Sequence, residues 1–182
     1  MSFTTDHKQK FEDLAFQIKN QDRLRLQANG GNSIIFSYPP EEESLYLEKA
    51  ADIFGDEVVF IDVAKLLVDF IDKEGWDEFK TYYESLSTTP HIVFKSSDPE
   101  MDLFDMIIEG ISTALADSKI PILIRTGVLL GTGIENVNIM EHAVVMHSAH
   151  PLVIFYPSTI KDDTLLFLNF KPASKYRCVL VK

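Results

Sequence analysis

The sequence lacks the cysteine pairs and the long apolar runs that define several classes of protein. Its one cysteine, Cys178, excludes an internal disulfide framework and agrees with a reducing compartment. Residues 1–10 contain no apolar core of signal-peptide length, and no stretch approaches the roughly 18 uninterrupted apolar residues of a membrane span. By elimination we expect a cytoplasmic protein that has no membrane partner.

Basic side chains are also scarce. The chain has 28 acidic and 17 basic side chains, a formal net charge of -11, so a nucleic-acid backbone would be repelled unless a local basic patch existed. The densest basic group, Lys19, Arg23 and Arg25, is explained by the solvated face of a first helix. We therefore expect no direct contact with nucleic acid.

The apolar content is sufficient for one sizeable core. Of the 182 residues, 46% are hydrophobic, and no repeat or Pro/Gly/Ser-rich linker marks an internal boundary. Helix and strand patterns alternate along the chain, which is typical of a parallel sheet covered by helices. The sequence predicts a single three-layer α/β domain over residues 1–182, with a mainly parallel central sheet of about five to seven strands.

Apolar runs locate the expected strands. They are Ser33–Tyr38, Glu57–Val63, His91–Lys95, Ile120–Thr126, Leu152–Tyr156 and Arg177–Val181, with Leu165–Phe170 as a hairpin partner. The unbroken run Val58–Ile61 is typical of a central parallel strand that is buried on both faces. Because loops that leave the carboxyl ends of parallel strands gather at one edge, the aperiodic stretch 127–150 is the expected place for a binding crevice.

Helical periodicity accounts for most of the remaining chain. The predicted helical regions are Thr5–Gln27, a helix from Pro39-Pro40 to Gly55, and a long region after Val63 that bends or breaks at Gly75. A further helix carries an apolar stripe from Leu103 to Leu115. Asp98, which precedes Pro99, is expected to cap this helix, and Asp102 and Asp105 are expected to face solvent.

The turn Gly127–Gly133 follows a predicted strand, which is the setting of a loop that binds phosphate. It lacks the lysine that would reach the β and γ phosphates, and its interior, Val128 to Leu130, prefers burial. We predict a degenerate phosphate-loop-like topology in which this turn is structural. Weak nucleotide or anion binding is the alternative, and its candidate residues are Gly127, Gly131, Thr132 and Gly133. Catalysis is a third possibility.

Three histidines suggest a metal site, for which Glu141 and Asp162 are further candidate ligands. His142, His147 and His150 are separated by five and three residues, so they do not share one face of a helix. We therefore interpret them as polar loop residues and expect no metal or other cofactor.

Other catalytic arrangements are incomplete. Asp62 and Lys65 are spaced one residue too far apart for the acid-x-lysine element of a nuclease, and Asp62 is better explained as a helix N-cap. No serine lies in a Gly-x-Ser-x-Gly turn, and Cys178 lies within a predicted strand. We expect no catalytic residues. A metal-dependent nuclease or phosphatase that uses Asp62 and the histidines is the alternative in this class.

Four segments of the C-terminal third resemble the BrxB family of bacteriophage exclusion (BREX) defence systems. They are Pro121–Val128, Asn138–Glu141, Pro151–Pro157 and Lys175–Arg177, and they cover about a third of the chain. Leu130–Glu135 stands where family members have a proline- and arginine-containing stretch, so the chain resembles a divergent member.

This resemblance implies an accessory role in anti-phage defence, alongside a methyltransferase, an ATPase and a large PglZ-type protein of the alkaline phosphatase superfamily. It also implies direct binding to the PglZ-type protein and no catalysis by this component. The surface candidates within the segments are Arg125, Thr126, Asn138, Glu141 and Tyr156. The alternative is a degenerate phosphate-loop-like domain that binds or hydrolyses nucleotide.

Overall fold

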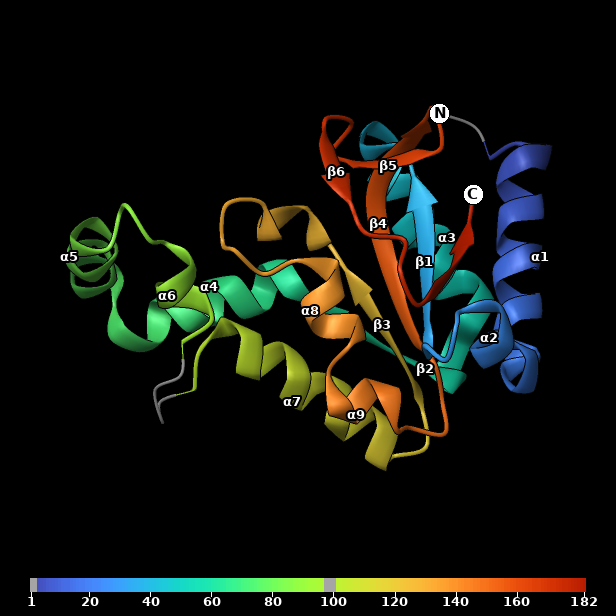
Figure 1. Ribbon diagram of the computed structural model, residues 1–182, viewed down its shortest axis with the longest axis horizontal. Helices are drawn as coiled ribbons and strands as arrows, with labels where there is room; N and C mark the ends of the chain where they lie inside the picture. The colour runs from blue at the N-terminus through green and yellow to red at the C-terminus, as the bar shows by residue number, and fades with distance from the viewer. Residues whose placement is uncertain (1–2, 97–100) are drawn as a thin grey trace.

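The computed structural model describes residues 3–96 and 101–182 (Figure 1). Within them, seven strands form a mixed sheet: β1 (Ser33–Tyr38), β2 (Val58–Asp62), β3 (Ile120–Ile124), β4 (Leu152–Lys161), β5 (Thr164–Phe167), β6 (Lys171–Ala173) and β7 (Cys178–Val181). The order β2-β3-β4-β1-β7 is parallel throughout, and β5 and β6 extend it as antiparallel strands from the second half of β4. The predicted α/β class is confirmed.

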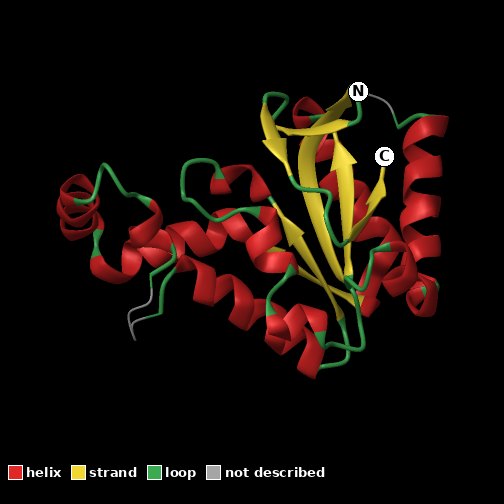
Figure 2. Ribbon diagram, in the orientation of Figure 1, coloured by secondary structure: helices red, strands yellow, loops and turns green. Residues whose placement is uncertain are grey.

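Helices cover both faces of this sheet. The described helices are α1 (Thr5–Lys19), α2 (Gln21–Gln27), α3 (Glu43–Phe54), α4 (Val63–Glu74), α5 (Trp76–Ser85), α6 (His91–Phe94), α7 (Leu103–Ala116), α8 (Asn136–Met140) and α9 (Ala143–Met146). Helices α1, α2 and α3 pack on one face, and α4, α7, α8 and α9 pack on the other (Figures 1 and 2). Within the described residues, no helix has both the length and the apolar character needed to cross a membrane.

Strand β1 lies between β4 and β7 and is buried on both faces. Ile34 and Phe36 point into the core beneath α1 and α3, whereas Ile35 points into the opposite core, and all three are fully buried. Alternate side chains of a strand point to opposite faces, so a continuous apolar run suits a strand covered on both sides.

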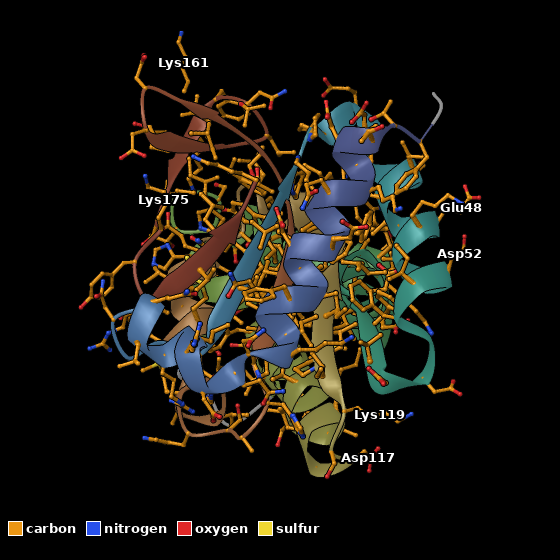
Figure 3. The ribbon with its side chains drawn as sticks, turned by 90° about the vertical axis from the view of Figure 1, so that its right-hand side faces the viewer. Glu48, Asp52, Asp117, Lys119, Lys161 and Lys175 are labelled. Atoms are coloured by element: carbon orange, nitrogen blue, oxygen red, sulfur yellow. The ribbon has the colours of Figure 1, made fainter. Side chains whose placement is uncertain are left out.

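Phe36 is the centre of an aromatic cluster beneath α1 and α3. Its ring centroid lies 5.1 Å from that of Phe11, 5.6 Å from that of Tyr46 and 4.7 Å from that of Phe155. These partners come from α1, α3 and β4, so a single side chain joins two helices to two strands. In Figure 3, α1 runs in front of the sheet, and Glu48 and Asp52 extend from α3 toward solvent.

The strand predicted at His91–Lys95 is wrong, because this segment forms the short helix α6. Pro90 precedes it in a helical backbone conformation, and Val93 and Phe94 enter the core through this single turn. A short apolar run fits either a buried strand or a buried helical turn, so the pattern alone does not separate them. Strands β2 and β3 pair directly without a strand between them.

The run Val58–Ile61 forms β2, but β2 is an edge strand and not the central strand that the sequence predicts. Its Val59 and Phe60 are only partly buried. The run is apolar because α7 covers one face of β2 and residues on the α3 side of the sheet cover the other. A strand covered on both faces needs apolar side chains whether it lies at the centre or at the edge of the sheet.

Helix boundaries differ from the predictions at two places. Thr5–Gln27 is two helices that meet at Asn20, whose side chain donates to the Phe16 carbonyl at 2.7 Å.

Asp102, expected to face solvent, is only 5% exposed, since its carboxylate caps α7 and accepts from the Asp105 and Ser96 amides. The predicted cap Asp98 lies outside the described residues. The predicted breaks at Gly55 and Gly75 are confirmed.

Phe36→Ala should lower the free energy of unfolding by about 3–5 kcal/mol, because it removes the shared partner of both helices and leaves a cavity. Urea denaturation measures this difference. The matched control is Phe16→Ala, whose side chain is 54% exposed on α1, and it should change stability by less than about 0.5 kcal/mol. Equal losses for the two variants would contradict the central role of Phe36.

Candidate functional site

The carboxyl ends of the parallel strands form the candidate site. Strands β1, β2 and β3 end at Tyr38, Asp62 and Ile124, and the register pairs Asp62 with Ile124. In an open parallel sheet, ligands bind in the crevice beyond these ends. The loops that leave β1, β2 and β3 therefore decide what this edge of the sheet can do.

Asp62 has two partners at this edge. One carboxylate oxygen accepts from the backbone amides of Ala64 and Lys65 at 3.1 and 3.2 Å, which caps α4 and confirms the N-cap interpretation. The other oxygen pairs with the Arg125 guanidinium. Lys65 thus contributes its backbone amide to Asp62, and the ion pair is made by an arginine that lies far away in the sequence.

Arg125 follows β3 in a left-handed backbone conformation, with φ 54° and ψ 37°. This conformation costs a residue with a β-carbon about 1 kcal/mol, and it persists where neighbouring contacts impose it. Here β3 holds the preceding residue, and the buried Thr126 hydroxyl donates to the Phe155 carbonyl at 2.8 Å. The Arg125 side chain is 48% exposed, so its pair with Asp62 adds only about 0–1 kcal/mol.

A second polar pair lies at the carboxyl end of β1, which is separated from β3 by β4. The Tyr38 hydroxyl donates to the Glu43 carboxylate at 2.8 Å. Burial raises the pKa of Tyr38, and the Glu43 charge raises it further, so the phenol stays protonated. The connection after β1, Pro39 to Glu43, carries three consecutive glutamates where a phosphate ligand would need donors.

The turn Gly127–Gly133 uses several of its own amides. The Leu130 amide donates to the Gly127 carbonyl at 3.2 Å, and the Thr132 amide donates to the Leu129 carbonyl at 3.1 Å. The buried Thr132 hydroxyl donates to the same Leu129 carbonyl and accepts from the Ile134 amide. These amides are directed into the turn, which fits a structural turn better than a loop that binds phosphate.

Two glycines in this turn require a positive φ. Gly131 and Gly133 have φ values of 86° and 76°. A β-carbon on Gly131 would meet open space, whereas one on Gly133 would lie 2.3 Å from the His91 β-carbon. Gly133 therefore allows the turn to pack closely against α6, whereas a β-carbon on Gly127 would make only an ordinary contact with Leu168, 3.5 Å away.

The five surface candidates have different environments. Thr126 and Tyr156 are buried, with 0% and 5% exposure, and Tyr156 stacks on Phe167 at 4.6 Å. Asn138 is half-buried and accepts from the Glu135 amide at the start of α8. Arg125 and Glu141 are exposed. Thr126 and Tyr156 therefore support the loop from inside, and Arg125 and Glu141 are the two candidates open to a partner.

The four C-terminal segments Pro121–Val128, Asn138–Glu141, Pro151–Pro157 and Lys175–Arg177 contact one another in pairs. Thr126 bonds to the Phe155 carbonyl, and Glu141 pairs with Arg177 at 3.6 Å. Arg177 precedes β7 at the amino ends of the parallel strands, whereas Arg125 follows the carboxyl end of β3. The exposed candidates Arg125 and Glu141 therefore belong to opposite ends of the sheet.

The histidines of the aperiodic stretch lie in local turns. His142 caps α9 by accepting from the Val144 amide at 3.3 Å, and His147 follows α9 on the surface. The buried His150 Nδ1 has no hydrogen-bond partner within residues 3–96 and 101–182. In the same residues, no group of three or more His, Cys, Asp or Glu side chains is arranged to hold a metal ion.

Cys178 lies in β7, as predicted, and its thiol donates to the Lys175 carbonyl at 3.3 Å. Burial raises the pKa of Cys178 to about 11. The thiol is therefore protonated at neutral pH, and its environment opposes the thiolate that a cysteine nucleophile needs.

Sequence reasoning missed the pairing of Asp62 with Arg125 and of Tyr38 with Glu43. The signal was present, because Tyr38, Asp62 and Arg125 each lie at the last or second-last position of a predicted parallel strand. The chain matches no family model, no curated protein and no solved structure. The chemistry of this edge therefore carries the functional inference.

Gly133→Ala should destabilise the protein by about 2–4 kcal/mol, because the new methyl group meets the His91 β-carbon in addition to the backbone strain. Gly131→Ala, the matched control, should lose only about 1 kcal/mol, since it adds strain without a clash. Urea denaturation compares the two variants. Equal losses would mean that the turn does not pack on α6 as described.

Proposed function

We propose that this protein is a non-catalytic accessory subunit of a bacterial, BREX-like anti-phage defence complex, and that it acts in the cytoplasm by binding a PglZ-type protein. The observation that carries the proposal is the position of Arg125. It belongs to the segment Pro121–Val128, which resembles the BrxB family, and it is exposed at the carboxyl edge in a conformation imposed by its neighbours.

The chemistry of the edge supports an interaction role. Asp62 is engaged by the α4 cap and by Arg125, and Tyr38 is engaged by Glu43. These contacts hold the side chains in fixed positions, which suits recognition. They also occupy the carboxylate and hydroxyl groups that acid–base chemistry would require. The roles of Thr126 and Tyr156 inside the protein likewise favour a rigid surface around Arg125.

We further infer a three-layer domain with a degenerate phosphate-loop-like topology. The five parallel strands and the helices on both faces support this inference. The departure from a working phosphate loop lies in two connections. Pro39–Glu43, after β1, is acidic, and Gly127–Gly133, after β3, has no lysine and an apolar interior.

Arg125 is the residue on which binding should depend. Its guanidinium is about half exposed, so N–H donors remain for a carboxylate or carbonyl of the partner. Arginine is also enriched among the residues that dominate protein interfaces. The exposed Leu130, which is 42% accessible, adds apolar surface to the same loop.

Arg125→Glu should weaken binding to the proposed PglZ-type partner by at least about tenfold, because it replaces a donor with a charge that also repels Asp62. Co-purification followed by titration calorimetry measures the affinity. The control is Arg23→Glu, an equal charge change on an exposed residue of α2, which should leave binding unchanged.

Two results would contradict the proposal at different levels. If the wild-type proteins form no complex at micromolar concentrations, the accessory-subunit function is wrong. If the complex forms and survives Arg125→Glu unchanged, the function stands and the assignment of Arg125 is wrong.

The alternative function is nucleotide binding or hydrolysis, and the strand-to-glycine-turn setting of Gly127–Gly133 is the feature that favours it. A ligand that binds only the native state raises its stability, by about 2.7 kcal/mol at a hundred times Kd. We expect no change in Tm with millimolar ATP or GTP and magnesium. A saturable rise in Tm that Gly131→Ala removes would favour the alternative.

A further inference from the structure

The connection between β2 and β3 extends far beyond what the sheet requires. Adjacent parallel strands need a crossover of about a dozen residues, usually one helix. Here the described part of the connection forms α4, α5, α6 and α7. Helices α5 and α6 lie at the end of the molecule away from the strands (Figures 1 and 2). We name residues 68–96 with 101–102 the helical arm.

The helical arm exposes a concentration of large apolar side chains. Among the described residues, six of the twelve large hydrophobic side chains that are exposed belong to it: Val68, Trp76, Tyr82, Tyr83, Ile92 and Met101. In α5, Phe79 is the one buried side chain, although the helix also carries a tryptophan and two tyrosines. Clustered exposed apolar residues mark interaction sites, and tryptophan and tyrosine dominate such sites.

Three of these side chains, Tyr82, Ile92 and Met101, line a groove. A cavity of about 560 Å³ lies between α4, α5, α6 and the start of α7. Phe70, Phe79 and Val93 form its apolar floor, and the exposed Tyr82 and Ile92 flank it. We name this cavity the arm groove. Its floor is part of the main core, so an occupant would contact a fixed surface.

The rim of the arm groove is acidic. Glu74 and Glu78 line it and are exposed, and Lys73 is the single basic side chain among the described lining residues. Neither glutamate forms an ion pair within residues 3–96 and 101–182, whereas the nearby Lys80 pairs with Glu84 at 3.9 Å. This rim favours a basic occupant.

The lining also determines the backbone conformation of an occupant. The groove lies between helices, and the residues that line it present side chains, without a strand edge beside them. An extended peptide buried there would leave backbone N–H and C=O groups without partners. A helix satisfies its own backbone and can insert apolar side chains spaced at i, i+3, i+4 and i+7.

We propose that the arm groove binds an amphipathic α-helix of a partner protein, one whose apolar stripe is flanked by lysine or arginine. The apolar stripe packs on Phe70, Phe79 and Val93, and the basic flanks meet Glu74 and Glu78. This surface uses other elements than Arg125 does, and the inference does not rest on the proposed function.

Trp76 provides one measurement, because it is the only tryptophan of the chain, is 62% exposed, and lies 6.3 Å from the ring of Phe79, which lines the groove. Titration calorimetry measures the affinity directly. The probe is a synthetic peptide of about 18 residues, long enough to form a helix, with leucines at i, i+3, i+4 and i+7 and lysine flanks. It should shift the Trp76 emission to shorter wavelength with saturation. A peptide with glutamate flanks, and one with the leucines scrambled, should bind at least about tenfold more weakly.

The charge of the rim is tested by the double variant Glu74→Lys and Glu78→Lys. It should lose at least about tenfold in affinity for the lysine peptide and gain affinity for the glutamate peptide. The matched control is Glu48→Lys with Asp56→Lys, the same charge change on the exposed α3 side of the molecule (Figure 3 shows Glu48). It should keep the wild-type preference, with both doubles checked for folding by circular dichroism.

Three outcomes would overturn the proposal. They are no binding of the lysine peptide by calorimetry or by Trp76 emission at millimolar concentration, equal binding of the scrambled peptide, and an equal loss in the control variant, which would indicate attraction by net charge alone. The PglZ-type complex gives a separate result, because its failure with wild-type protein would leave peptide binding to the groove unaffected.

Discussion

The parallel pairing of β1 between β4 and β7 is the constraint on which the rest of the structure depends. Ile35 enters one core while Ile34 and Phe36 enter the other, so the same strand organises both helical layers. A shift of one residue in its register would exchange the two sets of side chains. The position of Tyr38 at the carboxyl edge, beside Glu43, follows from this register.

The molecule offers two surfaces with different physical character. The edge around Arg125 is polar and rigid, since backbone pairing and the Thr126 hydrogen bond hold its loop. The helical arm is more apolar and lies at the periphery, where α5 buries little besides Phe79. The two proposed interactions, at the edge around Arg125 and in the arm groove, would therefore use surfaces that share no element.

Errors in the sequence interpretation have physical causes. His91–Lys95 is too short for periodicity to distinguish a strand from a helical turn, and only its packing beside Phe79 decides the matter. The sequence pattern placed the cap of this helix at Asp98, so Asp102 was expected on its solvated face. The helix begins at Leu103 instead, which makes Asp102 the N-cap. The aperiodic stretch 127–150 was correctly found to lack long elements, but its packing onto α6 through Gly133 is a tertiary contact.

The sequence by itself determined the α/β class, most of the strands, the helix breaks at Gly55 and Gly75 and the cap at Asp62, because these follow from local periodicity and backbone preference. Only the tertiary structure decided the strand order, the pairing of Asp62 with Arg125 and the burial of Thr126 and Tyr156. Those features depend on which distant segments lie side by side. Local patterns carry no information on that choice, since it is made by the packing of the whole chain.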